Sequence, residues 1–243
     1  MALNCGIVGI ASSGKTTLFN SLSRGKDIGS QISGRTNMGQ IEVPDPRLDA
    51  IANIVKPAKV VPTTVEIIDI PGMQKGASKI KGGNQFLADI RQTDAIIHVL
   101  RCFDDPSVPH MEGSVNPLRD KEIVDLELIT KDLESLEKKM QRLGKLASVG
   151  DKDAKKSMEV LSSLMDHFEE GQPARSFQIS PSDKHLLDDC FFLTIKPVIY
   201  VCNVDEASAM TGNHYVESAG PSIAEEGAEM LVIAALAESD IAK

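Results

Sequence analysis

Residues 9–17 read GIASSGKTT and overlap the end of an apolar run, LNCGIVGI (3–10). Two glycines separated by four residues stand before a lysine and a threonine. Glycine has no β-carbon, so a turn built on it brings backbone N–H groups close to an anion. The next residues, KTTLFNSLS (15–23), predict a helix whose N-terminus directs its positive dipole end at the same place. The stretch therefore predicts a phosphate-binding loop between a strand and a helix.

The side chains of this loop suit a nucleotide that is bound together with a metal ion. Lys15 is expected to reach the terminal phosphates, and the Thr16 hydroxyl is expected to coordinate Mg²⁺. The alternative interpretation is an ordinary glycine-rich turn that binds nothing. The other loop residues expected to contact the nucleotide are Ser12, Ser13, Gly14 and Thr17.

The bulk composition is that of a globular protein. The chain has 243 residues, of which 42% are hydrophobic and 25% charged, and its net charge is −9. This charge argues against a whole-surface affinity for nucleic acid, and we expect no sequence-specific DNA partner. The absence of a long apolar run and of a basic N-terminal region excludes a transmembrane helix and a signal peptide. Four cysteines without metal-like spacing indicate buried, reduced thiols, so we expect a cytoplasmic monomer.

Short apolar runs alternate with helical patterns along much of the chain. This alternation predicts an α/β fold in which parallel strands are covered by helices on both faces. Helices are expected at 15–23 and 84–92. Residues 30–39 are polar and contain two glycines, so we expect this segment to be mobile until a nucleotide binds. Strands are expected at 5–10, 39–43, 63–70, 95–103, 196–204 and 229–236.

Residues 120–190 break this alternation. Apolar residues recur every three or four positions from 120 to 147, which predicts a long helix with a narrow apolar seam. A break at 148–156 precedes a second helical pattern. We expect an antiparallel helical hairpin (120–190) inserted into a nucleotide-binding domain formed by 1–119 and 191–243; two ordinary crossover helices are the alternative. The seam residues are Ile123, Leu126, Ile129, Leu133, Leu136, Met140, Leu143 and Leu146.

The motif DIPG (69–72) supplies a second part of the expected site. Asp69 ends an apolar strand, and the carboxyl edge of a parallel sheet is where such folds bind ligands. Its carboxylate can hold Mg²⁺, and Gly72 lets a backbone N–H approach the γ-phosphate. Ser33 and Thr36, in the polar segment, are candidates for a further Mg²⁺ ligand. A simple turn is the alternative.

A late strand is followed by a candidate base-recognition loop, YVCNVDE (200–206). GTP-binding proteins usually carry Asn-Lys-x-Asp here, and the Asp accepts hydrogen bonds from guanine. This chain has Asn203 but Val204 in place of the lysine, and Glu206 in place of the aspartate, which weakens guanine selection. Ala234 and Ala235, in the run IAAL, are placed like the last loop of such a site, whose backbone meets the base.

The order of these motifs resembles the Obg-like ATPase (YchF) family of translation-factor-related P-loop proteins. The similarity covers nearly the whole chain and is most specific over 44–57 and 61–78, VPTTVEIIDIPGMQKGAS. It implies a P-loop G domain with an inserted antiparallel coiled coil, and ATP accepted as well as or better than GTP. It also implies slow hydrolysis, association with ribosomes, and a role in translation or stress control. The family continues into a C-terminal TGS domain, which this chain lacks.

The chain departs from the family pattern at several positions. Ala11, Ser12 and Ser13 stand where the family has Pro-Asn-Val, an asparagine that helps hold a monovalent cation in related proteins. Ser33 aligns with the switch threonine, and Thr36 aligns with a proline. Met73 occupies the place where many GTPases carry a water-orienting glutamine. The resemblance offers His110 for that catalytic role; a solvated loop histidine is the alternative.

Three functions are compatible with these motifs. The first is a Mg²⁺-dependent ATPase whose nucleotide state controls a partner, which the resemblance implies is the ribosome. The second is a GTP-dependent switch of the Obg-like type, and the third is an inactive interaction module built on the helical hairpin. Lys15, Thr16 and Asp69 argue against the third function, and Glu206 distinguishes the first from the second.

Overall fold

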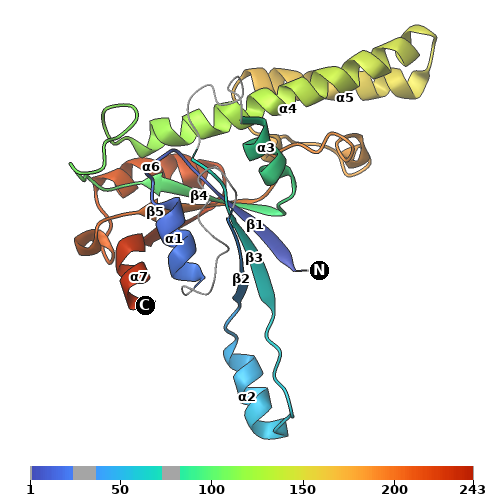
Figure 1. Cartoon of the computed structure of the whole chain (residues 1–243). Helices are drawn as coiled ribbons and strands as arrows, with labels where there is room; N and C mark the ends of the chain where they lie inside the picture. The colour runs from blue at the N-terminus through green and yellow to red at the C-terminus, as the bar shows by residue number, and fades with distance from the viewer. Residues whose placement is uncertain (1, 24–36, 73–82, 243) are drawn as a thin grey trace.

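The described part of the chain forms a six-stranded sheet with the strand order β2-β3-β1-β4-β5-β6. The computed structural model describes residues 2–23, 37–72 and 83–242 (Figure 1). Neighbouring strands are parallel except β2 and β3, which are antiparallel. The predicted α/β fold with a mostly parallel sheet is therefore confirmed. The strands are β1 (Leu3–Val8), β2 (Asn37–Glu42), β3 (Thr64–Asp69), β4 (Ala95–Arg101), β5 (Val198–Asn203) and β6 (Glu229–Ile233).

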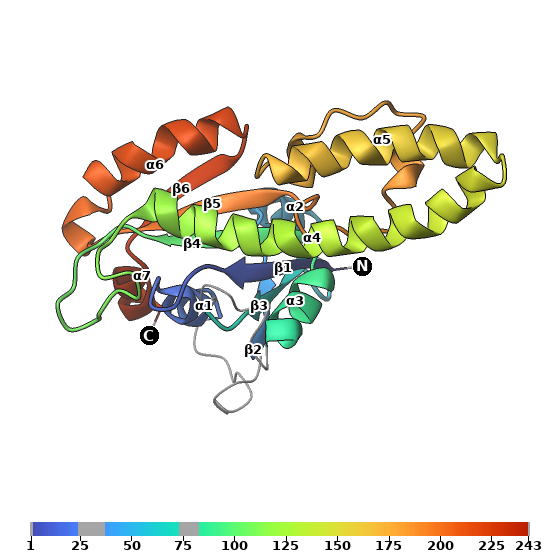
Figure 2. The ribbon, with the colours of Figure 1, turned by 90° about the horizontal axis from the view of Figure 1, so that it is seen from above.

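Helices cover both faces of the sheet, as expected for parallel strands. One face carries α1 (Lys15–Leu22) and α7 (Ala235–Ile241), which pack on buried residues of β1, β3, β4 and β5. The other face carries α3 (Gly83–Arg91), α4 (Pro117–Ser148) and α6 (His214–Glu225) (Figure 2). The predicted phosphate loop lies between β1 and α1.

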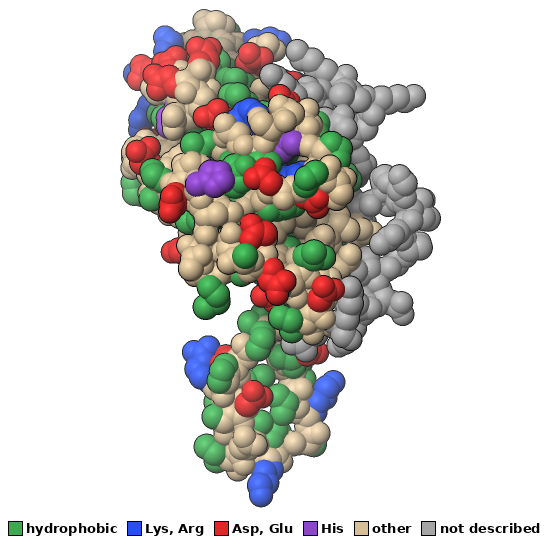
Figure 3. All heavy atoms as spheres, turned by 90° about the vertical axis from the view of Figure 1, so that its left-hand side faces the viewer, with side chains coloured by type: hydrophobic (Ala, Val, Ile, Leu, Met, Phe, Trp, Pro, Cys, Tyr) green, Lys and Arg blue, Asp and Glu red, His purple; other side chains and the backbone are tan. Residues whose placement is uncertain are grey.

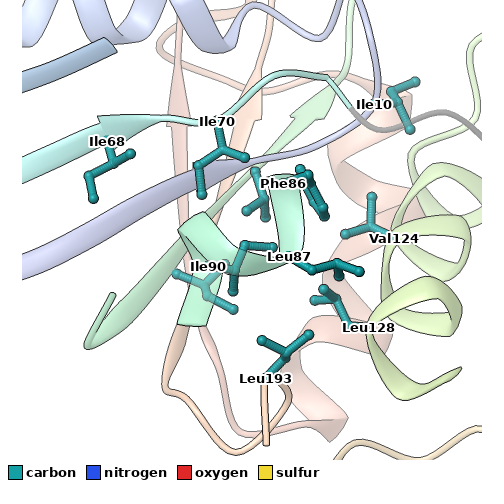
Figure 4. Packing of buried hydrophobic residues seen from close by; sticks show 11 residues of the cluster. Ile10, Ile68, Ile70, Phe86, Leu87, Ile90, Val124, Leu128 and Leu193 are labelled. Carbon is teal, nitrogen blue, oxygen red and sulfur yellow. The ribbon is translucent and has the colours of Figure 1, made fainter. Parts of the chain in front are cut away.

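Helix α3 is held between the sheet and α4. Phe86, Leu87 and Ile90 project from α3 into a cluster that also contains side chains of β3 and of α4 (Figure 4). Ile90 is fully buried. Burial of such a side chain contributes about 1.5–3 kcal/mol, so this cluster fixes α4 on the sheet.

The predicted helical hairpin is present, but a third segment completes its core. Helix α4 is followed by α5 (Lys152–Glu169), and the chain then returns through short 3₁₀ helices at Ala174–Ser176 and Lys184–Leu186. The hairpin extends beyond the edge of the sheet (Figure 1). Residues of the return segment pack between the helices and bury part of their apolar faces. These residues are Ala174, Phe177, Ile179, Leu187, Cys190 and Phe192.

The expected apolar seam of α4 is wrong at its two ends. Leu126 and Leu146 are 54% and 50% exposed, whereas Val124 and Leu128 are buried. The first turns of α4 face the sheet rather than α5, so their buried side is rotated relative to the seam further along. The hairpin boundary at residue 120 therefore stays a prediction, because the start of α4 packs with the nucleotide-binding domain.

A buried network of charges joins the hairpin to the sheet. Lys121 and Asp125 of α4 form an ion pair at 2.9 Å. Arg175, in the return segment, lies 3.0 Å from Glu226, which directly follows α6, and 3.8 Å from Asp125. Lys121 also pairs with Glu226, and the Tyr200 hydroxyl of β5 donates to the same carboxylate. Two cations and two carboxylates thus neutralise each other at this junction.

Helix α2 (Pro46–Val55) and its connecting strands project from the body as an arm (Figure 1). The side chain of Asp45 caps α2 by accepting a hydrogen bond from the Arg47 N–H. None of the ten residues of α2 is buried, and hydrophobic side chains lie exposed between basic ones (Figure 3). This helix was not predicted, although an aspartate before Pro46 is a typical helix start.

Several element boundaries differ from the expected ones. The segment 229–236 is not one strand, because β6 ends at Ile233 and α7 begins at Ala235. Helix α5 begins five residues earlier than expected, because the Asp151 side chain accepts hydrogen bonds from the N–H groups of the helix start. Asn37–Gly39 belong to β2 rather than to a mobile loop. The rest of that predicted loop lies outside the described residues.

Two smaller expectations also find an answer. All four cysteines are buried and free. Among the described residues, every helix is too short or too polar to span a lipid bilayer.

Candidate nucleotide-binding site

The predicted phosphate loop has the backbone of a tight anion-binding turn. Gly9 and Gly14 have φ angles of 148° and 97°, which side chains other than glycine rarely adopt. A β-carbon on Gly9 would lie 2.5 Å from the Val99 carbonyl oxygen, and one on Gly14 would lie 2.1 Å from Asn203 Nδ2. Ser12 also has a positive φ, 62°. The two glycines are therefore required by the close approach of β4 and β5.

Lys15 is a buried cation without a charged partner. Its side chain is 6% exposed, and its Nζ donates a 2.6 Å hydrogen bond to the Ile10 carbonyl oxygen. Burial lowers the pKa of Lys15 to about 8, and the nearby Asp69 carboxylate opposes this shift. A buried ammonium group gains most when an anion reaches it. The Ser13 hydroxyl is also buried and has no hydrogen-bond partner within the described ranges.

Thr16 and Asp69 bring two oxygen ligands together. Thr16 Oγ1 donates to Asp69 Oδ2 over 2.9 Å, although 53 residues separate them in the sequence. Mg²⁺ binds oxygen atoms at about 2.0–2.1 Å in octahedral geometry, and two oxygens this close can occupy adjacent ligand positions. The donor set therefore fits Mg²⁺. Asn37 was missed by the sequence analysis; its amide lies 3.4 Å from the same carboxylate oxygen.

The other predicted residues near the phosphates have mixed outcomes. Gly72 lies against the loop, since a β-carbon there would be 2.8 Å from Ala11 Cα and 3.0 Å from Lys15 Nζ. Thr17 is half-buried in the first turn of α1. Ser33, Thr36 and Met73 lie outside the described residues.

Asn203 connects the two ends of the candidate site. Its Nδ2 donates to the Ser13 carbonyl oxygen at 3.0 Å, and its Oδ1 accepts from the Ala235 N–H at 3.0 Å. The side chain is therefore oriented by two bonds, and the residue is 5% exposed. The structure assigns Asn203 to holding the loops together rather than to contacting a base. Ala234 and Ala235 are buried in the loop that it holds.

Glu206 is exposed at the start of a short 3₁₀ helix (Glu206–Ser208), which Asp205 caps by accepting from the Ser208 N–H. Its carboxylate is thus available to a base. Val204, in contrast, is 4% exposed and belongs to the core cluster under α6. A lysine at this position would place an ammonium group in that core, so the missing lysine has a structural reason.

His110 does not face an open site in this conformation. Its Nε2 lies 2.9 Å from Asp120 Oδ2, and its Nδ1 accepts from the Glu112 N–H. The side chain is only 4% exposed. Asp120 also pairs with Arg119. Because both ring nitrogens are occupied, His110 can orient water only after the ring leaves Asp120, and its catalytic role stays a prediction.

The loop, the Thr16–Asp69 pair and the Asn203 link together define a P-loop nucleoside triphosphatase with a G-domain fold. The sequence profile of the "50S ribosome-binding GTPase" family matches residues 4–143. The chain is 44% identical to the "Ribosome-binding ATPase YchF" of Bacillus subtilis and 41% identical to that of Escherichia coli O157:H7. Both similarities cover 100% of this chain and 68% of the relative. The chain therefore belongs to the YchF family.

A solved structure supports the same assignment. The fold matches the structure of the Schizosaccharomyces pombe YchF GTPase with a TM-score of 0.83 and 31% sequence identity. The match covers 99% of this chain and 67% of the other. The predicted family and fold are thus confirmed, and the chain is a nucleoside triphosphate hydrolase.

Proposed function

We propose that this protein binds and slowly hydrolyses ATP with Mg²⁺, and that its nucleotide state controls an association with ribosomes. The observation that carries the proposal is the buried Lys15, whose single hydrogen-bond partner among the described residues is the neutral Ile10 carbonyl. A triphosphate would replace that carbonyl with an anion. The preformed glycine turn would add backbone N–H donors and the N-terminus of α1.

Mg²⁺ would be held by Thr16 and Asp69, whose oxygens are 2.9 Å apart. When bound, the ion neutralises charge on the β- and γ-phosphates. Ser33 and Thr36 remain the candidates for a further ligand. The protein's own groups would complete the phosphate site: Lys15 on the terminal phosphates, the backbone of residues 12–17, and the N–H near Gly72.

The proposed preference for ATP depends on Glu206. Guanine presents two neighbouring donors that an aspartate accepts together, and the longer Glu206 side chain is displaced from that geometry. Adenine requires no such pair. Asn203 already bonds to Ser13 and Ala235, so we assign adenine recognition to Glu206 and to the backbone around Ala234. The names of the bacterial relatives, which describe ATPases, support this preference.

Association with ribosomes is proposed from the same relatives, which are named for ribosome binding. Co-sedimentation of the chain with ribosomes, with and without a non-hydrolysable ATP analogue, tests this part. We expect more protein in the ribosome pellet in one nucleotide state than in the other. Equal pelleting in every state would contradict nucleotide control.

A calorimetric nucleotide panel tests the central proposal. Non-hydrolysable ATP and GTP analogues are titrated with Mg²⁺ and with EDTA. We expect ATP to bind at least as tightly as GTP, and both to weaken without Mg²⁺. GTP binding about a thousandfold tighter than ATP binding, equivalent to ~4 kcal/mol, would overturn the base assignment.

Hydrolysis provides a separate test of His110. We expect His110→Ala to reduce ATP turnover about a hundredfold, the lower range for a lost general acid or base, without changing ATP affinity. His214→Ala, which changes an exposed histidine in the first turn of α6, is the control. Unchanged turnover would remove His110 from the mechanism.

A further inference from the structure

A cationic pocket lies away from the phosphate loop, where three segments meet. Its walls come from the last residue of α3, the middle of α4 and the return segment of the hairpin, and its volume is about 310 Å³. Figures 1 and 2 show α3 beside α4 on this side of the sheet. The lining side chains are Arg91, Ser135, Lys138, Lys139, Arg142, Asp189, Cys190 and Phe191.

The pocket carries an excess of positive charge in a chain whose net charge is −9. Lys139 is neutralised by Asp189, to which it is paired. No acidic side chain in the described ranges forms an ion pair with Arg91, Lys138 or Arg142. All three are exposed, and Lys138 and Arg142 stand one helical turn apart on α4. Three cations thus point to a ligand with several negative charges.

Phe191 is the second unusual feature of this pocket. It is 72% exposed, although an aromatic ring normally gains free energy by burial. Its φ angle is 49°, a left-handed conformation that is costly for a residue with a large side chain. The neighbouring Phe192 is buried in the hairpin core. The chain therefore buries one phenylalanine and presents the next one to solvent beside the cations.

We propose that this pocket binds single-stranded RNA, with a base stacked on Phe191 and phosphates on Arg91, Lys138 and Arg142. Proteins recognise unpaired RNA by stacking bases on aromatic rings and by contacting the backbone with basic side chains. An acidic polypeptide would use the cations but not the exposed ring. The inference rests on the proposed association with ribosomes, for which it supplies a surface and a chemical class of ligand.

The direct test is fluorescence anisotropy with a labelled oligouridylate of about ten nucleotides. We expect Phe191→Ala to weaken binding about 5- to 100-fold, the equivalent of ~1–3 kcal/mol per stacked base, and Phe191→Trp to retain it. Arg142→Gln and Lys138→Gln should each weaken binding and lower the salt dependence by about one phosphate contact. Lys155→Gln, an exposed lysine on α5, is the control for net charge.

Three results would overturn the inference. The first is an affinity that Phe191→Ala leaves unchanged, and the second is an equal loss in Lys155→Gln. The third is a polyglutamate peptide that competes as well as the RNA, which would indicate an acidic protein partner. The thermal unfolding midpoint and the ATP affinity of each variant should match the wild type, since Phe191, Lys138 and Arg142 are exposed.

Co-sedimentation separates this inference from the proposed function. If the wild type pellets with ribosomes and Phe191→Ala pellets equally well, the pocket is not the contact and the inference fails. If the wild type binds the oligouridylate through Phe191 but never pellets with ribosomes, the proposed association fails while the RNA site stands.

Discussion

Lys15 and Arg175 are both buried cations, but their surroundings differ. Lys15 has a neutral carbonyl as its partner, whereas Arg175 lies among Asp125, Glu226 and Tyr200. Burial lowers the pKa of Lys15 to about 8. At the junction, burial also acts to lower the pKa of Arg175, but the nearby acidic groups outweigh it and raise that pKa. An uncompensated buried charge therefore marks the site that awaits a ligand, and a compensated one marks a structural joint.

The largest expected effect is at the joint. Arg175→Met should lower the free energy of unfolding by about 3–5 kcal/mol, because it leaves buried carboxylates unpaired. The affinity for ATP should not change. Chemical denaturation and calorimetry measure the two quantities. The control is Arg47→Met, which removes an exposed ion pair with Asp45 and should cost at most about 1 kcal/mol.

A double-variant cycle sharpens this first prediction. Arg175→Met combined with Glu226→Gln should cost less than the sum of the single changes, since the second removes a charge that the first leaves unpaired. Additive costs would mean that the two side chains do not form one network, and the contrast with Lys15 would lose its basis.

Lys15→Ala should have the opposite profile. We expect ATP affinity to fall about 30-fold or more, equivalent to a loss of ~2–5 kcal/mol for a buried charge contact. The free energy of unfolding should stay unchanged or rise, because the variant no longer buries a cation without a charged partner. The same two measurements apply, with Lys155→Ala on the exposed face of α5 as control. Wild-type affinity in Lys15→Ala would exclude the phosphate loop as the binding site.

Asp132 tests the comparison with a carboxylate. It is 1% exposed and accepts hydrogen bonds from Leu193 and Thr194. Burial raises the pKa of Asp132 to about 6, from 3.8. The folded state therefore holds a proton that the unfolded state has released, and the stability from the neutral form, complete below about pH 4, is lost as pH rises to about 6.

The size of this pH effect is up to about 3 kcal/mol. Urea denaturation between pH 4 and 6 should show a decline in the wild type that is smaller in Asp132→Asn, because the amide does not titrate. Parallel pH profiles for the two proteins would show that Asp132 stays ionised throughout, like the compensated charges of the joint.

The smallest expected effect is at Glu206, which is exposed at the edge of the site. Glu206→Asp should shift the ratio of the ATP and GTP dissociation constants toward GTP by about tenfold, or ~1.4 kcal/mol. Calorimetric titration of both analogues measures it, and Glu217→Asp, an exposed glutamate of α6, is the control. Adding Val204→Lys would confuse the result, because Val204 is buried. No shift toward GTP would mean that the backbone alone selects the base.

Much of the site was predictable because its chemistry follows from local sequence. The glycines around Lys15 and the strand ending at Asp69 were recognised without a structure, and the structure places Thr16 against Asp69 as expected. Helix α2 was missed although Asp45 and Pro46 announce it, since the helix buries no residue and has no strong apolar periodicity. Leu126 was assigned to the hairpin seam because periodicity cannot tell which neighbour a long helix faces.

The sequence by itself determined the phosphate-binding turn, the alternation of strands and helices, and the two long helices that form the hairpin. These features depend on conformational preferences and hydrophobic periods within short stretches of chain. Only the tertiary structure decided that Asn203 ties Ser13 to Ala235, that Arg175 is compensated while Lys15 is not, and that Phe191 stands among cations. Each of these depends on residues far apart in the sequence, whose distances, burial and electrostatic interactions exist only after the chain has folded.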